Sequence, residues 1–574
     1  MQGIIFESKK EERREPAQAR QIKETPKVEP PVQKAGNLTP EALSLLKYYE
    51  FALSAESSGE WEPKLKVGDT LSSVAQVYER LRYAVDYKKE HLLRRNAIER
   101  MLKRQLRAVG ERDSREIAEN LIKELIWARY LRNDSLPVSK VTEAAEIIAK
   151  YVKFFDLVGE RYPSRDEESK WRDWLVGVLS CEIEESLDPS LNSIDALSQA
   201  TLSWFKKRYE WKGDGLDDAQ KDIQLTIAVY RGLFRTDDAR TAYHLLKNLY
   251  PQWSQIRSEN LNGMTGKIFE LFQAIQADLN PPIQTRLYRF VQRQISAFQI
   301  LKEVVEEDVR GAPKVLASPE ALDEAVYDVC EEKYSEISDR VTRGIVRSII
   351  YIFITKIFFA IVIEIPYEYY FLGGISILPL LTTILIPILF VFLVAFTIKR
   401  PDEANTERIL DKIFDFVYVS GRKEKTSFSL TSANRGGITY KAFAIAYGVL
   451  FFLTFGAISY LLQKIGFNMV GGAIFFIFLS LVLLFAYRVK FTASELNVTG
   501  EKENLFGHLM SNLSLPLLDL GVWLADKFSR FNFLIVFLDI LIEAPLKNVI
   551  GVADEWTSFV KERREEVVEV PVER

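Results

Sequence analysis

The stretch that decides the fold is residues 345–365, which read IVRSIIYIFITKIFFAIVIEI. At the rise of an α-helix, about 20 apolar residues cross the ~30 Å hydrocarbon core of a bilayer. Three further apolar segments follow, at residues 372–398, 442–462 and 470–487, and each approaches or exceeds that length. The sequence therefore predicts four transmembrane helices.

The distribution of charge separates these segments from the rest of the chain. The 574 residues have a net charge of −4 and a mean hydropathy of −0.04, values that suit a soluble protein. Residues 344–398 and 442–487, however, hold only five charged side chains, whereas about one residue in three is charged elsewhere. We infer an integral membrane protein with a large water-soluble part.

The four segments are arranged as two predicted hairpins. The first lies within residues 341–398, with a short connection near residues 366–370, and the second lies within residues 442–490. Residues 399–441, between the hairpins, contain nine Lys or Arg residues and a predicted short amphipathic helix. The positive-inside rule places this loop in the cytoplasm, and with four spans both termini are cytoplasmic. The expected location is a plasma or inner membrane, crossed several times.

Residues 39–340 are predicted to form an all-α cytosolic domain of about ten helices. Apolar residues recur there at three- and four-residue spacing, the period of a helix packed on one face. Thr39, Pro40 and Glu41 supply the N-cap hydroxyl, the first-turn proline and the first-turn acid that mark a helix start. The fold class predicted for the whole chain is therefore all-α.

Two features lie at the two ends of this domain. Residues 1–38 are rich in charge and proline and poor in apolar groups, so they are predicted to be a disordered tail. A helix that begins at Ser318 meets no breaker before the first apolar segment. One continuous helix is therefore expected to join the cytosolic domain to the membrane.

The chain beyond the second hairpin is expected to stay at the membrane. Residues 491–560 form an amphipathic region with very apolar runs at 513–526 and 531–542. We expect an interfacial or re-entrant helix here, because the second run is short for a span. The alternative is that residues 528–548 form a fifth span, which would place the charged tail at 561–574 outside.

The residues needed for common cofactor sites are scarce. Two cysteines and three histidines cannot build a Cys/His zinc site, a haem-attachment motif or a multi-disulfide scaffold, so no metal and no cofactor is predicted. The sequence GMTGK at 263–267 lacks the first glycine and the Ser/Thr of a phosphate loop. The carboxylates of Glu182, Glu184 and Glu185 are interpreted as a solvated helix face. These absences favour a protein that is not an enzyme.

Lys356, at the midpoint of the first segment, belongs to a candidate intramembrane polar site that also includes Glu364 and Asp539. A charged residue at the bilayer centre costs about 3 kcal/mol, which the apolar residues of this segment offset. One interpretation is a relay for protons, ions or an anionic substrate. The alternatives are a lysine that snorkels to the interface, or one that is ion-paired to Glu364 or to an acid of the C-terminal segment.

Two prolines and two small residues mark the other segments. Pro379 and Pro387 in the second segment are predicted to kink the helix, and the kink is a candidate gate. The alternative is an ordinary kinked packing helix. Ala444 and Gly448 provide a small surface for close helix contact, either within the bundle or between two copies of the chain.

One stretch of the cytosolic domain is strongly basic. Residues 88–107 combine an apolar face with eight cations and are predicted to form a basic amphipathic helix. Three interpretations compete: a core helix whose solvated face pairs with acids, a surface that docks on anionic lipid or on a protein, and, least favoured, a nucleic-acid site. The cations of this candidate patch are Lys88, Lys89, Arg94, Arg95, Arg100, Lys103, Arg104 and Arg107.

The leading functional hypothesis is a membrane-anchored helical interaction or scaffold protein at the cytoplasmic face. It rests on the expected stiff helix, the basic stretch and the missing catalytic motifs, and it implies a protein partner for the cytosolic domain. A transporter or channel that uses Lys356 and the Pro379/Pro387 helix is one alternative. A membrane enzyme on lipid-linked substrates, with Asp519, Asp526 and Asp539 as candidate acids, is another.

Overall fold

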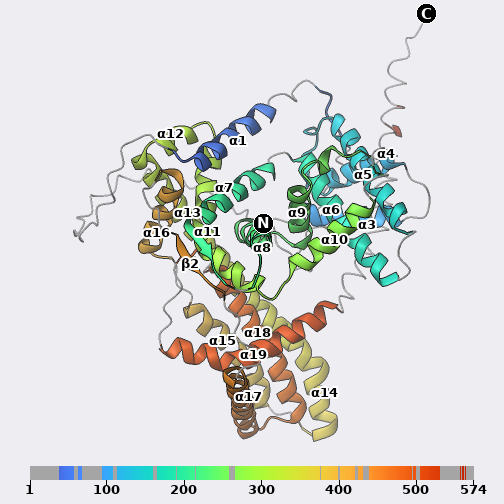
Figure 1. Ribbon diagram of the computed structural model, residues 1–574. Coiled ribbons are helices and arrows are strands. Elements are labelled where there is room, and N and C mark those ends of the chain that lie inside the picture. The colour runs from blue at the N-terminus through green and yellow to red at the C-terminus, as the bar shows by residue number, and fades with distance from the viewer. Residues whose placement is uncertain are drawn as a thin grey trace, which may run out of the picture.

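The computed structural model is predominantly helical (Figure 1). It describes residues 38–56, 62–67, 93–107, 113–159, 165–188, 191–213, 215–257, 261, 265–374, 377–397, 401–419, 425–430, 438–493, 496–498, 505–530, 556, 559, 560 and 563. The predicted tail at 1–37, the basic residues Lys88 and Lys89, the carboxyl group of Asp539 and the apolar run 531–542 lie outside the described residues.

Two hydrophobic cores lie outside the apolar helices, and the first contains no residue of those helices; we call this part the distal lobe (Figure 1). Its helices are amphipathic, as on α4, where Ile117, Leu121 and Leu125 form the buried stripe. The side chain of Asp237 caps α9 by accepting a hydrogen bond from the backbone of Arg240 at 3.0 Å. The elements are α3 (Leu93–Arg107), α4 (Ser114–Trp127), α5 (Ser139–Gly159), α6 (Arg165–Leu187), α9 (Asp238–Leu249), η4 (Trp253–Gln255) and α10 (Thr265–Leu279).

The second core forms the proximal lobe, which joins the apolar helices. Its first helix begins at Pro40, as expected, and the hydroxyl of Thr39 accepts a hydrogen bond from the backbone of Ala42 at 3.2 Å. The same hydroxyl donates to the carbonyl of Phe416, far along the chain, at 2.5 Å. The elements are α1 (Pro40–Glu56), α7 (Asn192–Arg208), α8 (Asp218–Phe234), α11 (Gln284–Glu307), α12 (Ala312–Ala317), the first half of α13 (Pro319–Phe359) and α16 (Glu403–Val417).

The expected continuous helix is confirmed. The 41 residues of α13 run without a break from the Ser318 N-cap to Phe359, and the helical path continues through η6 (Ala360–Glu364), α14 (Ile365–Tyr367) and η7 (Glu368–Leu372). The first connection is therefore not at residues 366–370, as expected, but at Gly373, whose φ of 72° suits glycine. Wide π-helical turns on both sides of Pro366 relieve the clash that a proline causes inside an α-helix.

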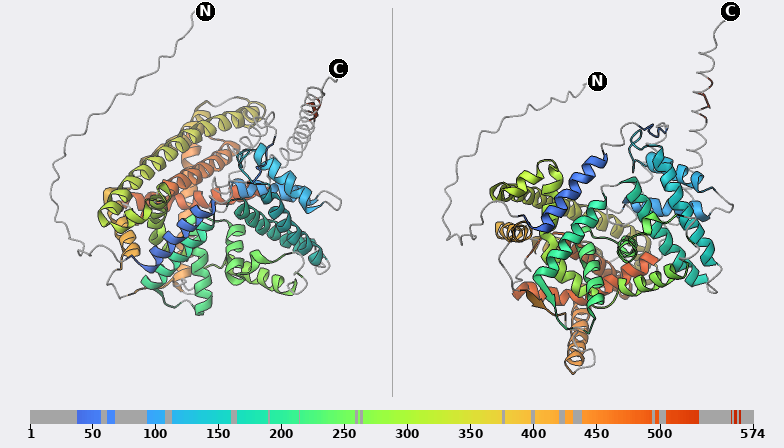
Figure 2. Two further views of the ribbon diagram at one scale, coloured as in Figure 1. Left: turned by 90° about the horizontal axis from the view of Figure 1, so that it is seen from above. Right: turned by 45° about the horizontal axis from the view of Figure 1, so that its top comes forward.

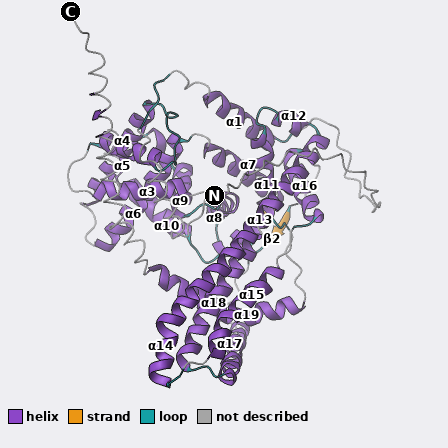
Figure 3. Cartoon of the chain, turned by 180° about the vertical axis from the view of Figure 1, so that it is seen from behind, coloured by secondary structure: helices purple, strands orange, loops and turns teal. Residues whose placement is uncertain are grey.

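The remaining apolar helices complete a bundle on one side of the soluble lobes, as Figures 1 and 3 show. They are α15 (Ile377–Thr397), α17 (Ile438–Ile465), α18 (Met469–Ala493) and α19 (Leu505–Arg530). Among the described residues, two helices are long and apolar enough to cross a bilayer, at Lys441–Ile465 and Met469–Phe491. Helix α18 packs against α13, α15 and α19, whereas α17 projects from the rest of the molecule (Figure 2).

The all-α prediction misses one small sheet. Strand β1 (Tyr209–Trp211) pairs in parallel with β2 (Thr426–Phe428), with Glu210 opposite Ser427. Parallel pairing joins distant parts of a chain, so no hairpin signal announces it. Because β2 and α16 both belong to residues 399–441, the basic loop between the predicted hairpins is folded onto the proximal lobe.

Candidate functional site

Lys356 and Glu364 form a buried ion pair inside the apolar helices. The exposed fraction is 1% for Lys356 and 6% for Glu364, and the ammonium donates to the carboxylate. Residues eight apart on a regular α-helix differ by about 80° around its axis. The π-helical stretch η6 lies between the two residues and ends at Glu364; it rotates less per residue, which brings the two side chains into line. Of the alternatives that the sequence left open for Lys356, the ion pair with Glu364 is present in the structure.

The surroundings of this pair are almost wholly apolar. The ammonium of Lys356 lies 5.1 Å from the ring centroid of Phe478 on α18, a cation–π distance. One turn beyond Glu364, the carboxylate of Glu368 accepts a hydrogen bond from the amide of Asn468 at 3.1 Å. Asn468 lies between α17 and α18, so this contact ties the ends of the two helix pairs together. Sequence reasoning missed it because both partners sit at predicted turns.

The two prolines of α15 play different roles. Pro379 is the third residue of the helix, where its missing N–H has no helical acceptor to lose, so the kink expected there is wrong. Pro387 lies inside the helix and does remove a hydrogen bond. Both rings are buried, and the gate proposed for this helix stays a prediction.

Helix α19 lies across the end of the bundle that faces the soluble lobes (Figure 1), and the interfacial or re-entrant helix expected around residues 531–542 lies outside the described residues. A Cβ at Gly521 would lie 2.5 Å from the carbonyl oxygen of Ser480, so only glycine permits this crossing with α18. Tyr487 and Ser514 share a hydrogen bond of 2.9 Å between α18 and α19. The Tyr447 hydroxyl of α17 donates to Asp519, which therefore acts as a helix-packing group.

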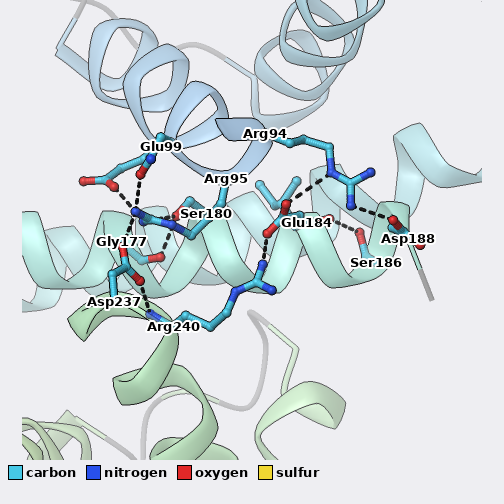
Figure 4. A network of polar contacts seen from close by, with 12 residues as sticks. Arg94, Arg95, Glu99, Gly177, Ser180, Glu184, Ser186, Asp188, Asp237 and Arg240 are labelled. Carbon is cyan, nitrogen blue, oxygen red and sulfur yellow. Dashed lines mark hydrogen bonds and ion pairs between the residues drawn. The ribbon is translucent and has the colours of Figure 1, made fainter. Parts of the chain in front are cut away.

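Four described cations of the basic helix α3 are paired with acids. Arg94 donates to Glu184 and Asp188, at 3.2 and 2.6 Å, and Lys103 pairs with Glu99 and Asp173, each at 2.9 Å. Arg95 is buried and reaches Glu99, Ser180 and Asp237, as Figure 4 shows. Arg104 pairs with Glu124. Acids of α3, α4, α6 and the α9 cap pair with these four cations, as the interpretation of a core helix expects, and the lipid- or partner-docking interpretation stays a prediction.

The acids of α6 are the other half of this network, and the expectation of a solvated face is wrong for two of them. Glu182 and Glu184 are buried. Glu184 accepts from Arg94 and from Arg240 of α9 (Figure 4). Glu185 accepts from Lys247 at 2.7 Å. Helix periodicity alone missed their burial because neighbouring helices cover three sides of α6.

Glu182 belongs to a second buried cluster. It accepts hydrogen bonds from Lys150 at 2.5 Å, from the Tyr151 hydroxyl at 2.6 Å and from the Trp253 indole at 3.0 Å. Burial lowers the pKa of Lys150 from its ordinary value, although Glu182 acts in the opposite direction. Burial also raises the pKa of Tyr151 well above its ordinary value. The cluster is a saturated hydrogen-bond network that locks α5, α6 and η4 together.

A third cluster surrounds Asp195 at the start of α7. Its carboxylate lies 2.7 Å from His244 Nδ1 and accepts from the Tyr230 hydroxyl and from Lys247, each at 2.8 Å. Burial would raise the pKa of Asp195, but His244 and Lys247 outweigh it and lower that pKa. The cluster joins the two lobes, because α9 belongs to the distal core and α8 mainly to the proximal one.

The two cysteines have no reactive character in this fold. Cys181 and Cys330 are both buried and free. Burial raises the pKa of each thiol to about 11, so the nucleophilic thiolate is rare at neutral pH. Neither thiol is placed for covalent catalysis.

The junction between the proximal lobe and the bundle is closely bonded. Asn405 of α16 donates its amide to the Tyr334 hydroxyl at 2.9 Å and to the carbonyl of Leu496 at 3.0 Å, and it accepts from the backbone of Val498 at 2.9 Å. Lys412 donates to the carbonyl of Arg293 at 3.0 Å. These bonds hold α16, α13, α11 and the segment after α18 in one assembly.

The aromatic and basic stretch 204–212 is part of the same junction. Trp204 and Phe205 are buried, and the Trp204 indole donates to Asp415 of α16 at 3.0 Å. The cations of this stretch are also paired, with Lys206 bound to Asp222 at 2.8 Å, Lys207 to Glu41 and Arg208 to Asp415. This segment covers the proximal core and binds α16, which belongs to the loop between the predicted hairpins.

The described residues contain no group of three or more His, Cys, Asp or Glu side chains placed to hold a metal ion. The polar groups described above are bound to one another rather than gathered at a shared open position. In comparisons with protein-family models, with curated proteins and with solved structures, no match to this chain was found.

Proposed function

We propose that this protein is a membrane-anchored helical scaffold, in which the apolar bundle lies in the bilayer and the two soluble lobes are held at the cytoplasmic face for a protein partner. The observation that carries the proposal is the continuous helix α13, which belongs to the proximal core at one end and to the apolar bundle at the other.

The distribution of exposed apolar side chains supports the membrane part of this proposal. On the described soluble lobes, few large apolar residues are exposed, among them Leu43, Val138 and Leu249. The bundle exposes them along most of its length, including Phe358 and Phe452, at 61% and 78%. Such a surface is far larger than a soluble protein tolerates in water, and a bilayer is the solvent that suits it.

The rigid junction supports the scaffold part. A tethered domain would have a polar linker with few contacts. Here, α13 runs from the proximal lobe into the bundle, and Asn405 of the proximal lobe donates to the carbonyl of Leu496, just after α18. The lobes would therefore keep a set orientation to the membrane, which favours presentation of a surface to a partner.

The proposed topology has four spans, formed by the second half of α13 with η6 to η7, and by α15, α17 and α18. The turns at Gly373 and Gly466 would face outward, and residues 399–441 and both termini would face the cytoplasm. The support is the pairing of these helices and the cluster of cations at their cytoplasmic ends.

Labelling of introduced cysteines tests this topology. Gly374→Cys and Lys464→Cys should react with a membrane-impermeant maleimide on intact cells, and Lys425→Cys should react only after the membrane is opened. Background from Cys181 and Cys330 should be low because both thiols are buried. Labelling of Lys425→Cys on intact cells, or release of the protein by alkaline carbonate without detergent, would contradict the proposal.

Cross-linking of the full chain in native membranes tests the scaffold role. Amine-reactive cross-links to a partner should concentrate on exposed lysines of the distal lobe such as Lys170 and Lys267. If no partner is cross-linked to either lobe of the intact protein, the scaffold proposal is contradicted.

The alternative of a transporter or channel has one specific observation in its favour, the buried Lys356–Glu364 pair inside the apolar helices. It predicts flux through vesicles that contain the purified protein, and loss of that flux in Lys356→Met. Equal or absent flux in both proteins would leave the scaffold as the better account.

A further inference from the structure

Exposed tyrosines are concentrated on the apolar bundle. Among the described residues, the exposed tyrosines are Tyr369, Tyr370, Tyr447 and Tyr460, and none of them lies on the soluble lobes. The hydroxyl of Tyr447 donates to Asp519 of α19. Tyr369, Tyr370 and Tyr460 are 63%, 78% and 60% exposed, and their hydroxyls form no hydrogen bond with any residue that the structure describes. These three side chains are therefore open to whatever surrounds the bundle.

The three tyrosines lie at the end of the bundle away from the lobes. Tyr369 and Tyr370 belong to η7, next to the connection that leads to α15, and Tyr460 belongs to the last two turns of α17. The hydrogen bond of 3.1 Å from Asn468 to Glu368 sets η7 and the turn after α17 at one level. Figure 3 shows α14, which precedes η7, and α17 reaching this end of the molecule together.

The exposed side chains change character along the helical path that leads to η7. Nearer the lobes, the exposed Phe358, Ile361 and Val362 carry no polar side-chain atom and suit hydrocarbon. About two turns further, Tyr369 and Tyr370 combine an apolar ring with a hydroxyl, which suits a boundary between hydrocarbon and water. The change indicates a boundary of this kind at η7.

The length of α17 indicates the same level. Lys441 and Lys464 flank its apolar part and are 23 residues apart, which is about 35 Å in an α-helix and slightly more than the ~30 Å hydrocarbon core. Tyr460 lies about 6 Å inside Lys464 along the helix axis. The Lys464 ammonium is 5.6 Å from the centroid of the Tyr460 ring. Lysines that snorkel outward and tyrosines at the edge of the core are typical of a membrane interface.

We propose that Tyr369, Tyr370 and Tyr460 form an outer belt that lies at the boundary between the headgroups and the hydrocarbon of the outward leaflet. This inference rests on the proposed membrane location and topology, and it adds the depth at which the bundle sits. In this position the rings contact acyl chains, and the hydroxyls donate to the phosphate and ester oxygens of phospholipids.

Spin labels measure this depth. Tyr370→Cys and Tyr460→Cys, each in the full chain, would be labelled with a nitroxide and reconstituted in phosphatidylcholine vesicles. Collisions with oxygen, which prefers hydrocarbon, and with a water-soluble nickel chelate give the depth of each label. The two labels should agree within about 5 Å, the rise of one helical turn. Cys181 and Cys330 should add little background because both are buried.

Two control positions bracket the belt. Phe358→Cys, an exposed aromatic position on the same helical path, should carry a label about 15 Å deeper than that of Tyr370→Cys, because 12 residues separate the two positions. Lys425→Cys, an exposed position of the proposed cytoplasmic loop, should be open to the nickel chelate. If either belt variant fails to reconstitute, Tyr369→Cys is read in its place.

Three results would overturn the inference. A Tyr370→Cys label as open to the nickel chelate as that of Lys425→Cys would place η7 in water, and a label as deep as that of Phe358→Cys would place it in hydrocarbon. A label reached by neither reagent would mean that protein, such as a second copy of the chain, covers the belt. Failure of the proposed function is distinguishable, because the Phe358→Cys label would then also lose its preference for oxygen.

Discussion

Lys150 in the distal lobe and Lys356 in the apolar bundle are both 1% exposed, and each is paired with one glutamate. Their settings differ. The partner of Lys150 is 32 residues away on another helix, and Tyr151 and Trp253 donate to the same carboxylate. The partner of Lys356 is eight residues away on the same helical path, with an aromatic ring beside the ammonium.

The difference matches the two solvents that the proposed function assigns to these parts, water for the lobe and lipid for the bundle. In the water-soluble lobe, unfolding returns both charges to water, so the pair holds only because further hydrogen bonds complete it. In a bilayer the helix persists when its neighbours separate, so a pair within one helix neutralises the charge without help from tertiary contacts. The Lys150 cluster should therefore stabilise tertiary packing, and the Lys356 pair should mainly permit insertion.

The largest effect is expected at Glu182. Glu182→Ala would leave the Lys150 ammonium buried without its carboxylate and remove the acceptor for Tyr151 and Trp253, so we expect a loss of about 3–5 kcal/mol in unfolding free energy. Denaturant unfolding in detergent, followed by tryptophan fluorescence, measures it. Glu168→Ala on the same helix, at an exposed pair, is the matched control. A loss below about 1 kcal/mol would contradict the conclusion that the Lys150 cluster stabilises tertiary packing.

A smaller effect on folding is expected at Lys356. Lys356→Met leaves Glu364 buried alone, at a cost of about 2–3 kcal/mol for an unpaired charge among apolar helices. The double variant Lys356→Met/Glu364→Gln should recover most of that cost, because no charge remains. Thermal unfolding in detergent and membrane yield report the result. If the double variant is no more stable than Lys356→Met, then neutralisation of the two charges is not what the pair contributes.

Lys412 differs from Lys150 and Lys356, because its described acceptors are uncharged. Lys412 donates to two backbone carbonyls and to the Gln294 side chain, and burial lowers its pKa to about 8. The unfolded chain then binds more protons than the folded chain between pH 8 and the ordinary lysine pKa, so stability should rise with pH in that window. Lys412→Met should abolish this part of the rise. An identical pH dependence of unfolding in wild type and variant would contradict the assignment.

The smallest effect is expected at the exposed pair Arg172–Glu168, where the nitrogen and oxygen are 2.9 Å apart. Arg172→Ala should change the unfolding free energy by less than about 1 kcal/mol, because water already solvates both charges. Added salt should remove even that difference. A cost near that of Glu182→Ala would mean that burial is not what separates these pairs.

Much of the secondary structure could be predicted from the sequence, because helices are encoded locally. The Pro40 start and the unbroken α13 follow from caps and breakers, whereas the sequence indicated only the apolar run 513–526 of the longer helix α19. The turn after the first apolar segment lies later in the chain than the sequence predicts. A proline usually ends a helix, but two π-helical stretches allow this helix to continue past Pro366.

The candidate sites were less predictable, because burial of a polar residue depends on what packs over it. The cations of α3 and the acids of α6 have the composition of solvated faces, yet they meet each other across the distal core. No local pattern distinguishes a basic face that meets acids from one that meets lipid.

The sequence alone determined the separation of apolar from charged segments and the helical class, since each depends on residues close together in the chain; it offered Glu364 as one of several possible partners for Lys356. Only the tertiary structure decided that Lys150 meets Glu182, that Arg95 meets Asp237 across 142 residues, and that β1 pairs with β2. The physical reason is that periodicity shows which side of an element is buried, whereas the partner depends on the packing of elements far apart in the chain.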